Sequence, residues 1–325
     1  MNVRKIRNKK IPKAIIFGIA GKKLTNVEKE FFKKTNPLGF ILFERNCKNF
    51  HQLKELVKDL KNSLSHNYPL IMIDQEGGRV ARLKKPHWKK YPPADFFGKK
   101  AENNLAHAKK LVFENSRNIA KDLKNLGINV NCAPVLDVKY PFTHSVIGNR
   151  AFSNNPDIVS ELGKIFCKGL KCMGIIPVLK HIPGHGPSKV DSHKLTPIVE
   201  INLKDLIERD FLPFKKLNNQ PFAMIAHIIY SKIDSSLACT SQFIIKNIIK
   251  KKIRFKGLLI SDDINMKALK GSLTSRVINI LNSGCNIILH CNGKIKEMRK
   301  IQKVIPHIDS VSFKKIVNIK KKFNN

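Results

Sequence analysis

The sequence has no apolar run near the roughly 20 residues that a membrane-spanning helix requires. It is also poor in acidic residues: 24 Asp and Glu stand against 61 Lys and Arg, which leaves a formal charge of +37 over 325 residues. Hydrophobic residues make up 42% of the chain, a share typical of globular proteins that argues against wholesale disorder. We therefore expect a soluble, folded and very basic protein without a membrane partner.

The sequence contains no CxxC pair, and its seven cysteines are odd in number and scattered along the chain. Zinc–thiolate sites usually bring cysteines in closely spaced pairs, and secreted disulfide frameworks use even numbers of them. The pattern therefore argues against both, and it indicates buried free thiols in a reducing compartment.

A charge of +37 is by itself typical of a nucleic-acid-binding protein. The positive residues are mostly Lys, however, and they are spread along the chain. The densest runs, Lys250–Lys252 and Lys320–Lys322, are short and lack the interleaved aromatic residues that stack on bases. We therefore expect no specific nucleic-acid partner, and we keep a basic nucleic-acid-binding protein as an alternative.

The N-terminal region has two interpretations. Basic residues from Arg4 to Lys13 precede an apolar run from Ala14 to Ala20, an order that resembles a signal peptide. The run is at the short limit for a signal peptide, and Lys22 and Lys23 follow it at once. We favour a buried first strand and a cytoplasmic location.

Short apolar runs rich in β-formers alternate with longer amphipathic stretches along the whole chain. The expected strands are Ala14–Gly21, Gly39–Glu44, Leu70–Asp74, Ile128–Asp137, Ile175–His181, Phe222–Tyr230, Gly257–Asp262 and Cys285–Cys291. The expected helices are Val27–Lys34, Phe50–Leu64, Glu102–Leu126, Ile158–Met173, Leu203–Leu217, Ser241–Lys252 and Leu273–Asn282, with a last one from Lys294.

This alternation predicts an α/β fold with a parallel sheet covered on both faces. Eight strands favour a (β/α)₈ TIM barrel, and a doubly wound open sheet is the alternative. Because no linker or composition break appears, we expect residues 1–325 to form a single domain with a basic helical C-terminal tail from about residue 308.

Polar residues follow four of the expected strands at the point where each strand ends. They are Asp74, the pair Lys180 and His181, His227, and the pair Asp262 and Asp263. In a barrel these strand ends share one face, which is where active sites form. The sequence therefore predicts a convergent polar site there.

The irregular stretch from His181 to Pro197 is rich in Gly, Pro and His. In extended backbone Asp191 and His193 project to the same side, and an Asp–His pair suits proton transfer near neutral pH. A metal site is the alternative, since His181, His185, Asp191 and His193 are possible zinc ligands. Against it, Pro183 and Gly184 exclude the helix on which HxxxH spacing is useful.

Several motifs carry a family resemblance. KHIPGHG and VDSH occur with IDQEGGRVARL upstream and LLISDDINM downstream, and GFILFERN, APVLDV, IGNRAFS and MIAHIIYSKID are also present in consistent order. From about Gly18 to Gly293 the sequence resembles family 3 glycoside hydrolases, in particular their single-domain bacterial β-N-acetylglucosaminidase branch. The resemblance implies a TIM barrel without the second domain of larger members.

The resemblance also implies roles for individual residues. Asp262, the first of the SDD pair, is the nucleophile, and Asp191 with His193 is the acid/base dyad. The residues that hold the non-reducing GlcNAc are Asp74, Arg82, Arg150, Lys180 and His181. Asp263 receives no catalytic role. The sequence departs from the family at Asn149, where Glu or Asp is common, and at Ile182, which replaces Phe.

The implied activity is that of a retaining exo-β-N-acetylglucosaminidase with a covalent glycosyl-enzyme intermediate and without metal or cofactor. The implied substrate is a GlcNAc-anhydroMurNAc peptide of peptidoglycan recycling. Three alternatives remain open at this point: a β-GlcNAc phosphorylase on the same site, a metal-dependent hydrolase using the His-rich loop, and the basic nucleic-acid-binding protein considered above. A monomer is favoured, although the sequence does not define the oligomeric state.

Overall fold

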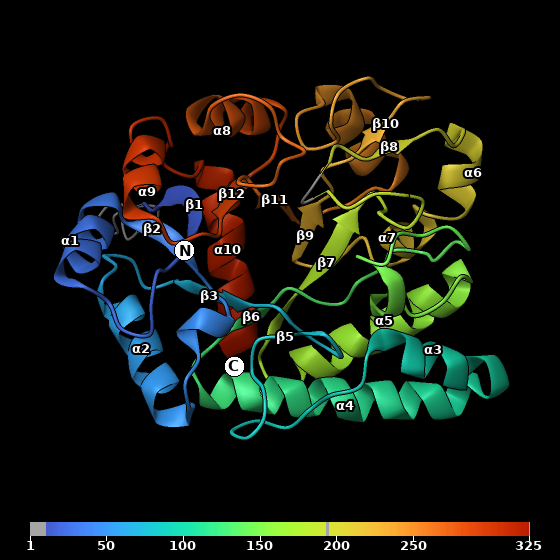
Figure 1. The fold of residues 1–325 in the computed structure, drawn as a ribbon, viewed down its shortest axis with the longest axis horizontal. Coiled ribbons are helices and arrows are strands. Elements are labelled where there is room, and N and C mark those ends of the chain that lie inside the picture. Colours follow the sequence, from blue (N-terminus) through green and yellow to red (C-terminus); the bar gives the residue numbers. More distant parts are fainter. Residues whose placement is uncertain (1–10, 193–194, 325) are drawn as a thin grey trace.

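Eight parallel strands close into a barrel in the computed structural model, which describes residues 11–192 and 195–324 (Figure 1). The strands follow one another around the barrel in chain order. They are β1 (Lys13–Gly18), β2 (Pro37–Leu42), β3 (Leu70–Ile73), β6 (Val130–Asn131), β7 (Ile176–Ile182), β9 (Phe222–Ile225), β11 (Leu258–Asp263) and β12 (Ile287–His290). The predicted (β/α)₈ barrel is confirmed, and the doubly wound open sheet is wrong.

Strand β1 closes the ring by pairing in parallel with β2 on one side and with β12 on the other. Its residues Ile15, Ile16 and Phe17 are fully buried. The apolar run that begins at Ala14 is therefore part of the barrel core, as the strand interpretation predicted.

Helices surround the barrel on its outside (Figure 1). The main ones are α1 (Asn26–Thr35), α2 (Phe50–Asn62), α3 (Ala94–Asn103), α4 (Leu105–Asn125), α5 (Pro156–Lys171), α6 (Leu203–Glu208), α7 (Leu212–Lys216), the π-helix η4 (Ile244–Lys252), α8 (Leu273–Asn282), α9 (Ile295–Gln302) and α10 (Ser310–Asn324). Capping residues determine where several of these helices begin. Thr25 and Glu28 form a capping box on α1, and Asn155 caps α5 with Pro156 at its first position.

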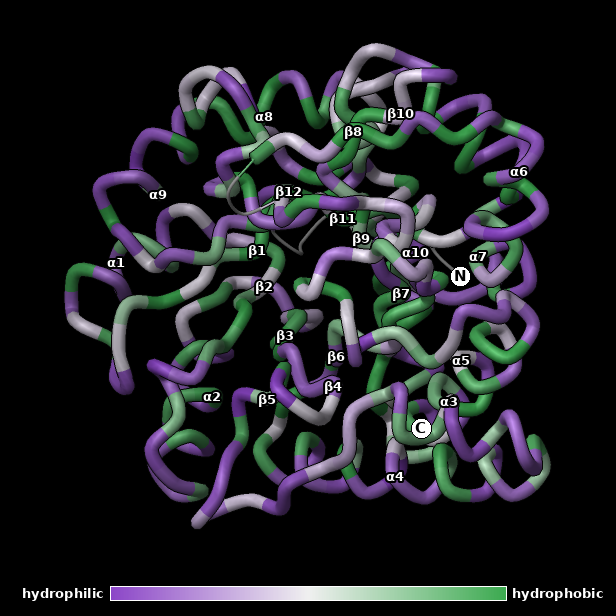
Figure 2. The backbone as a smooth tube through the Cα atoms, turned by 45° about the vertical axis from the view of Figure 1, so that its right-hand side comes forward, coloured by the Kyte–Doolittle hydropathy of each residue, from purple (hydrophilic) through white to green (hydrophobic). Residues whose placement is uncertain are grey.

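Each helix packs one face against the barrel. Figure 2 shows hydrophilic and hydrophobic residues alternating along helices such as α4. In α4 the residues Ala108, Val112, Ile119 and Leu123 are fully buried at helical spacing. The C-terminal helix α10 follows the same rule, because Phe313 and Ile316 are buried.

Two predicted helices are each divided in the structure. The expected helix Glu102–Leu126 is part of α3 and then α4, because Asn104 is extended and its side chain caps α4 by accepting from the His107 N–H. The expected helix Leu203–Leu217 is α6 and then α7. Pro213 in the first turn of α7 lacks an N–H and disfavours a continuous helix through the residue before it.

None of the helices within residues 11–192 and 195–324 combines the length and apolar character needed to cross a membrane. All seven cysteines are free thiols, and five of them are buried, namely Cys132, Cys167, Cys239, Cys285 and Cys291.

Candidate active site

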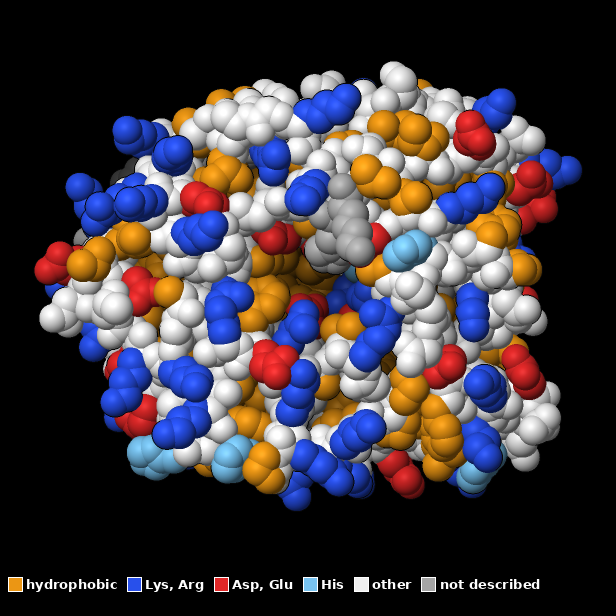
Figure 3. Space-filling view, viewed as in Figure 1, with side chains coloured by type: hydrophobic (Ala, Val, Ile, Leu, Met, Phe, Trp, Pro, Cys, Tyr) orange, Lys and Arg blue, Asp and Glu red, His pale blue; other side chains and the backbone are white. Residues whose placement is uncertain are grey.

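The face of the barrel shown in Figure 3 is hollowed at its centre, and acidic and basic side chains lie in the hollow. Because all eight strands are parallel, their C-terminal ends meet at one face. Asp74 directly follows β3, Lys180 and His181 lie near the end of β7, and Asp262 lies near the end of β11. The structure thus brings strand-end residues from distant parts of the sequence to one place.

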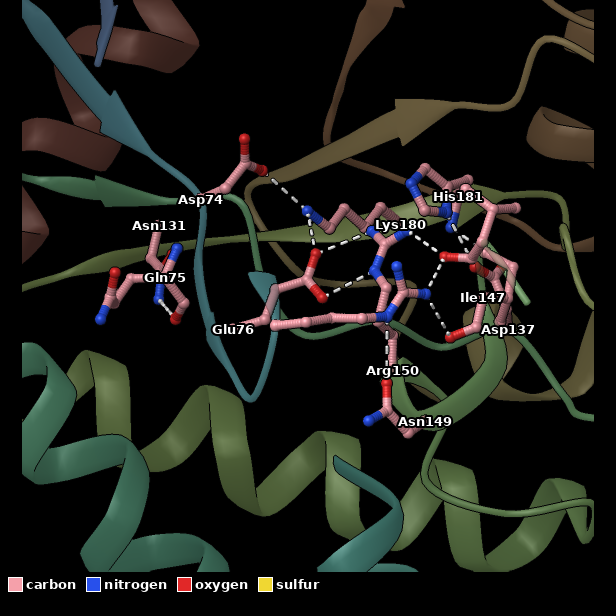
Figure 4. A network of polar contacts seen from close by, with 12 residues as sticks. Asp74, Gln75, Glu76, Asn131, Asp137, Ile147, Asn149, Arg150, Lys180 and His181 are labelled. Atoms are coloured by element: carbon pink, nitrogen blue, oxygen red, sulfur yellow. Dashed lines mark hydrogen bonds and ion pairs between the residues drawn. The ribbon is translucent and has the colours of Figure 1, made fainter. Parts of the chain in front are cut away.

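Asp74, Lys180 and Arg82 form an ion-pair cluster, in which the pair of Asp74 and Lys180 can be followed in Figure 4. Lys180 Nζ lies 2.8 Å from Asp74 Oδ1, and Arg82 donates to Asp74 Oδ2 at 3.0 Å. Burial alone would raise the pKa of Asp74, but the charges of Lys180 and Arg82 hold it well below its usual range. The pKa of Lys180 is raised despite burial, because Asp74 and a second carboxylate face it. These groups are therefore all charged at neutral pH.

The second carboxylate is Glu76, which the sequence interpretation did not assign to the site. It lies on β4 (Gln75–Gly77), which pairs with β5 (Val80–Ala81) in a short hairpin. Glu76 Oε1 is 2.6 Å from Lys180 Nζ, and both Glu76 oxygens accept from Arg150, at 2.8 and 2.9 Å. Figure 4 shows Lys180 reaching between Asp74 and Glu76. Arg150 thereby joins the same cluster.

His181 is oriented by Asp137, a second residue that the sequence interpretation missed. Asp137 is fully buried, and its Oδ2 lies 2.7 Å from His181 Nδ1. Its Oδ1 accepts from the backbone N–H groups of His181 and His185. Burial opposes ionisation of Asp137, but His181 outweighs it and the pKa is lowered to about 2. Because Nδ1 faces the carboxylate, Nε2 is the ring nitrogen that His181 can offer to a substrate.

Asp262 and Asp263 are neighbours in different environments. The half-buried Asp262 accepts a 2.7 Å hydrogen bond at Oδ1 from the Asp263 N–H. Asp263 Oδ1 accepts from the N–H groups of Asn265 and Cys291, which ties β11 to the residue that follows β12. Burial, reinforced by the charge of Asp262, raises the pKa of Asp263 to about 6. Asp263 therefore connects two strand ends.

Asp262 lies at the same face of the barrel as the ion-pair cluster, because it is near the C-terminal end of β11 and all eight strands are parallel. The buried thiol of Cys132 is affected by both. Burial raises the pKa of Cys132 well above its usual value, the charges of Asp74 and Asp262 raise it further, and the charge of Lys180 lowers it.

Asp191 lies in the loop that follows β7, and its charge acts on Arg79. Burial lowers the pKa of Arg79, whereas the charges of Glu76 and Asp191 raise it, so both carboxylates lie near that guanidinium. Arg79 is fixed by hydrogen bonds to Asn149 Oδ1 and to the carbonyls of Ser145 and Val146. His193 lies outside the described residues, so the structure does not describe the second member of the expected dyad.

The described residues offer no group of three or more His, Cys, Asp or Glu side chains arranged to hold a metal ion. Of the four ligands considered for a metal site, His181 faces Asp137 and the His185 ring contacts Ser192, while His193 is outside the described part of the chain.

Comparison with known proteins identifies the family. Residues 4–321 match the family described as Glycosyl hydrolase family 3 N terminal domain. The chain belongs to glycosyl hydrolase family 3. A β-hexosaminidase of Nitrosomonas eutropha is 35% identical over 284 residues, which cover 86% of this chain and 80% of that protein.

Solved family 3 structures share the fold over almost the whole chain. NagZ from Neisseria gonorrhoeae in complex with N-trifluoroacetyl-D-glucosamine is 29% identical, with a TM-score of 0.88 over 96% of this chain and 90% of that one. NagZ from the same organism in complex with a zinc ion has a TM-score of 0.87 at 29% identity, over 95% of this chain and 90% of that one.

The structure joins four of the residues that the sequence placed in the site in one ion-pair cluster, namely Asp74, Arg82, Arg150 and Lys180. His181 and Asp262 lie near the ends of β7 and β11 at the same face of the barrel. Glu76 and Asp137 received no role from the sequence, although they follow or end expected strands and stand in the motifs IDQEGGRVARL and APVLDV. Glu76 is two residues after Asp74, and this same-side spacing on an extended chain is a further signal that could have placed it in the site.

Asp263 allows a test of its environment by pH. Its raised pKa means that the folded protein retains a proton that the unfolded chain releases between about pH 4 and pH 6. This contribution to stability is present below about pH 4 and is lost as the pH rises through 6. Asp263→Asn keeps an Oδ1 that can accept both N–H groups but cannot titrate. We expect the variant to gain stability relative to the wild type from pH 4 to pH 6.5 in urea unfolding; parallel pH profiles would contradict this.

Proposed function

We propose that this chain, a family 3 glycoside hydrolase of the β-N-acetylhexosaminidase type, removes terminal β-linked GlcNAc with retention of configuration. The observation that carries the proposal is that Asp262, near the end of β11, lies at the same barrel face as the ion-pair cluster of Asp74, Lys180 and Arg82. A carboxylate nucleophile beside fixed donors and acceptors for sugar hydroxyls is the arrangement that a retaining glycosidase requires.

In the first step, Asp262 attacks the anomeric carbon and a covalent glycosyl-enzyme forms as the bond to the leaving oxygen breaks. His193 gives its proton to that oxygen, and Asp191 orients the ring and stabilises its positive charge. In the second step, water attacks the anomeric carbon, His193 takes a proton from it, and the Asp262 carboxylate is released. Two inversions leave the β configuration unchanged.

The ion-pair cluster supplies the sugar-binding groups. Asp74 is held ionised, so it accepts hydrogen bonds from sugar hydroxyls, while Arg82, Arg150 and Lys180 donate them. His181 adds a donor or acceptor at Nε2, because Asp137 occupies Nδ1. Their own ion pairs hold these side chains before the substrate arrives, which lowers the cost of binding.

By the family resemblance, the natural substrate is a GlcNAc-anhydroMurNAc peptide and the role is peptidoglycan recycling in the cytoplasm. Such fragments are anionic, and Lys and Arg side chains surround the hollow in Figure 3. The positive field is expected to steer them inward, so their kcat/KM should fall with added salt. A neutral aryl glycoside serves as the control. Equal salt dependence for the two substrates would mean that the positive charge of the protein has no part in substrate recognition.

The deciding experiment is a panel of aryl glycosides assayed at several phosphate concentrations. We expect cleavage of aryl β-GlcNAc, release of β-GlcNAc as the first product, and rates independent of phosphate. Formation of GlcNAc 1-phosphate would instead support a phosphorylase. Activity should also survive a chelator, and loss of activity that zinc restores would support a metal-dependent hydrolase. No cleavage of any glycoside would overturn the proposal.

His193→Ala is expected to reduce kcat/KM for poor leaving groups by about 10²–10⁴-fold, the usual contribution of acid–base catalysis. For a dinitrophenyl glycoside, whose leaving group needs no proton, the loss should be small. Because kcat/KM reports only formation of the glycosyl-enzyme, the slower second step does not mask the difference. Equal losses on both substrates would argue against an acid role for His193.

A further inference from the structure

Ser192 stands between Asp191 and His193, the two residues proposed as acid and base. It is only 4% exposed, although it lies in a loop without regular secondary structure among its described residues. Its hydroxyl oxygen is 3.3 Å from His185 Nε2, and its carbonyl accepts a 3.3 Å hydrogen bond from the Ala268 N–H. The hydroxyl and the carbonyl of Ser192 therefore both bond to residues outside the turn in which Ser192 lies.

Ala268 connects this loop to the segment that follows the proposed nucleophile. It lies after β11, in the irregular stretch that begins beyond Asp263. Its N–H donates to Ser192, and its carbonyl accepts a 3.1 Å hydrogen bond from Thr196 Oγ1. Ala268 thus bonds to Ser192 and to Thr196, which stand on either side of positions 193 and 194 in the sequence.

A cavity of about 630 Å³ lies beside this segment and is lined by Thr196, Ala268 and Leu269 together with residues of α8. The hydrogen bonds that Ala268 makes with Ser192 and Thr196 therefore join the loop to the segment after β11 at the edge of this cavity.

His185 provides a rigid support on the other side. The residue is 3% exposed, and its N–H donates to Asp137 Oδ1 at 2.7 Å. The same carboxylate orients His181, so the sugar-binding histidine and this support share one anchor. His185 Nδ1 has no hydrogen-bond partner within the described residues, and His185 Nε2 contacts the Ser192 hydroxyl. Among the described residues, loss of that hydroxyl would leave both ring nitrogens buried without a hydrogen-bond partner.

We propose that Ser192 is a positioning residue: its bonds to His185 and Ala268 fix the loop that carries the proposed acid/base residues to the segment that follows Asp262. The inference rests on the proposed function of that dyad. Ser192 touches no reacting atom, and its effect passes through the placement of the proton donor. A misplacement of about 1 Å in a catalytic group can cost roughly 10²-fold in rate.

The test compares Ser192→Ala with Ser188→Ala. Ser188 lies in the same loop and is also buried, but its hydroxyl donates to the Val190 carbonyl and does not contact His185. We expect Ser192→Ala to lower kcat/KM about 10²-fold for an alkyl or unactivated phenyl β-GlcNAc, but only a few-fold for the dinitrophenyl glycoside. We expect Ser188→Ala to retain the wild-type ratio between these substrates, whatever its effect on thermal stability.

Two further variants distinguish a loss of positioning from misfolding of the protein. Ser192→Thr keeps the hydroxyl and should restore most of the activity on the poor leaving group. His185→Ala should reproduce the Ser192→Ala pattern, and the double variant should be no worse than either single one, because all three break the same hydrogen bond. Fully additive losses would overturn the proposal.

The outcomes separate this inference from the proposed function. If the wild type lacks β-GlcNAc activity, or if His193→Ala shows no dependence on the leaving group, the proposed function fails. If both behave as expected but Ser192→Ala loses activity equally on the two substrates, only the positioning role is overturned.

Discussion

Replacing Asp262 by Ala is expected to lower kcat/KM for an aryl β-GlcNAc by about 10⁴-fold or more, because loss of a covalent nucleophile has effects of this size. Three neighbouring carboxylates are already engaged: Asp74 and Glu76 are held by cations, and Asp263 accepts the N–H groups of Asn265 and Cys291. Turnover would be measured with the purified variant against the wild type.

The matched control is Asp263→Asn. This change removes the neighbouring carboxylate, and the variant should retain far more activity than the Asp262 variant. Added azide should partly restore turnover of an activated glycoside by Asp262→Ala and give the α-glycosyl azide, since the small anion attacks from the face that the carboxylate vacates. Wild-type rates in Asp262→Ala would end the assignment of a nucleophile at this position.

Replacing Glu76 by Gln is expected to destabilise the protein by about 3–5 kcal/mol, because it leaves buried cations without one of their carboxylate partners. The side chains of Glu76, Arg150 and Lys180 are 8%, 11% and 2% exposed. Gln keeps the shape of Glu but not its charge, so the change isolates the ion pairs. Urea unfolding would measure the loss, and the KM for an aryl β-GlcNAc should rise because Arg150 and Lys180 shift.

Glu44→Gln provides the control for this change. Glu44 pairs with Lys84 at 2.6 Å, but their side chains are 60% and 51% exposed, so solvent screens the pair. Its loss should cost at most about 1 kcal/mol. Equal destabilisation by Glu76→Gln and Glu44→Gln would contradict the view that the buried cluster organises the site.

The strands were predictable because their information is local. Each barrel strand is a short apolar run, and polar residues appear where it ends, as at Asp74 and Asp262. The start of α5 was equally readable from Asn155 and Pro156, because a cap depends on neighbouring residues alone. The break at Asn104 was missed, since the apolar periodicity continues across it and only the backbone conformation interrupts the helix.

The site residues show the same difference between local information, which the sequence carries, and long-range contacts, which it does not. Asp74, Lys180 and Asp262 were found because they end strands of a barrel, and parallel strands bring such ends together. The partners of Glu76 and Asp137 were not found. Glu76 meets Arg150 from 74 residues away, and Asp137 meets His181 from 44 residues away. A sequence pattern over neighbouring residues carries no information about contacts at such separations.

By itself the sequence determined the barrel, its strand order, the charge of +37 and the strand-end residues on which the proposed chemistry depends. The tertiary structure alone decided which charges neutralise one another at the barrel mouth. It placed Glu76 between Arg150 and Lys180, set Asp137 behind His181, and bonded Ser192 between His185 and Ala268. The physical reason is that buried charges and hydrogen bonds are strong only over a few ångströms, and closure of the barrel brings these groups within that range.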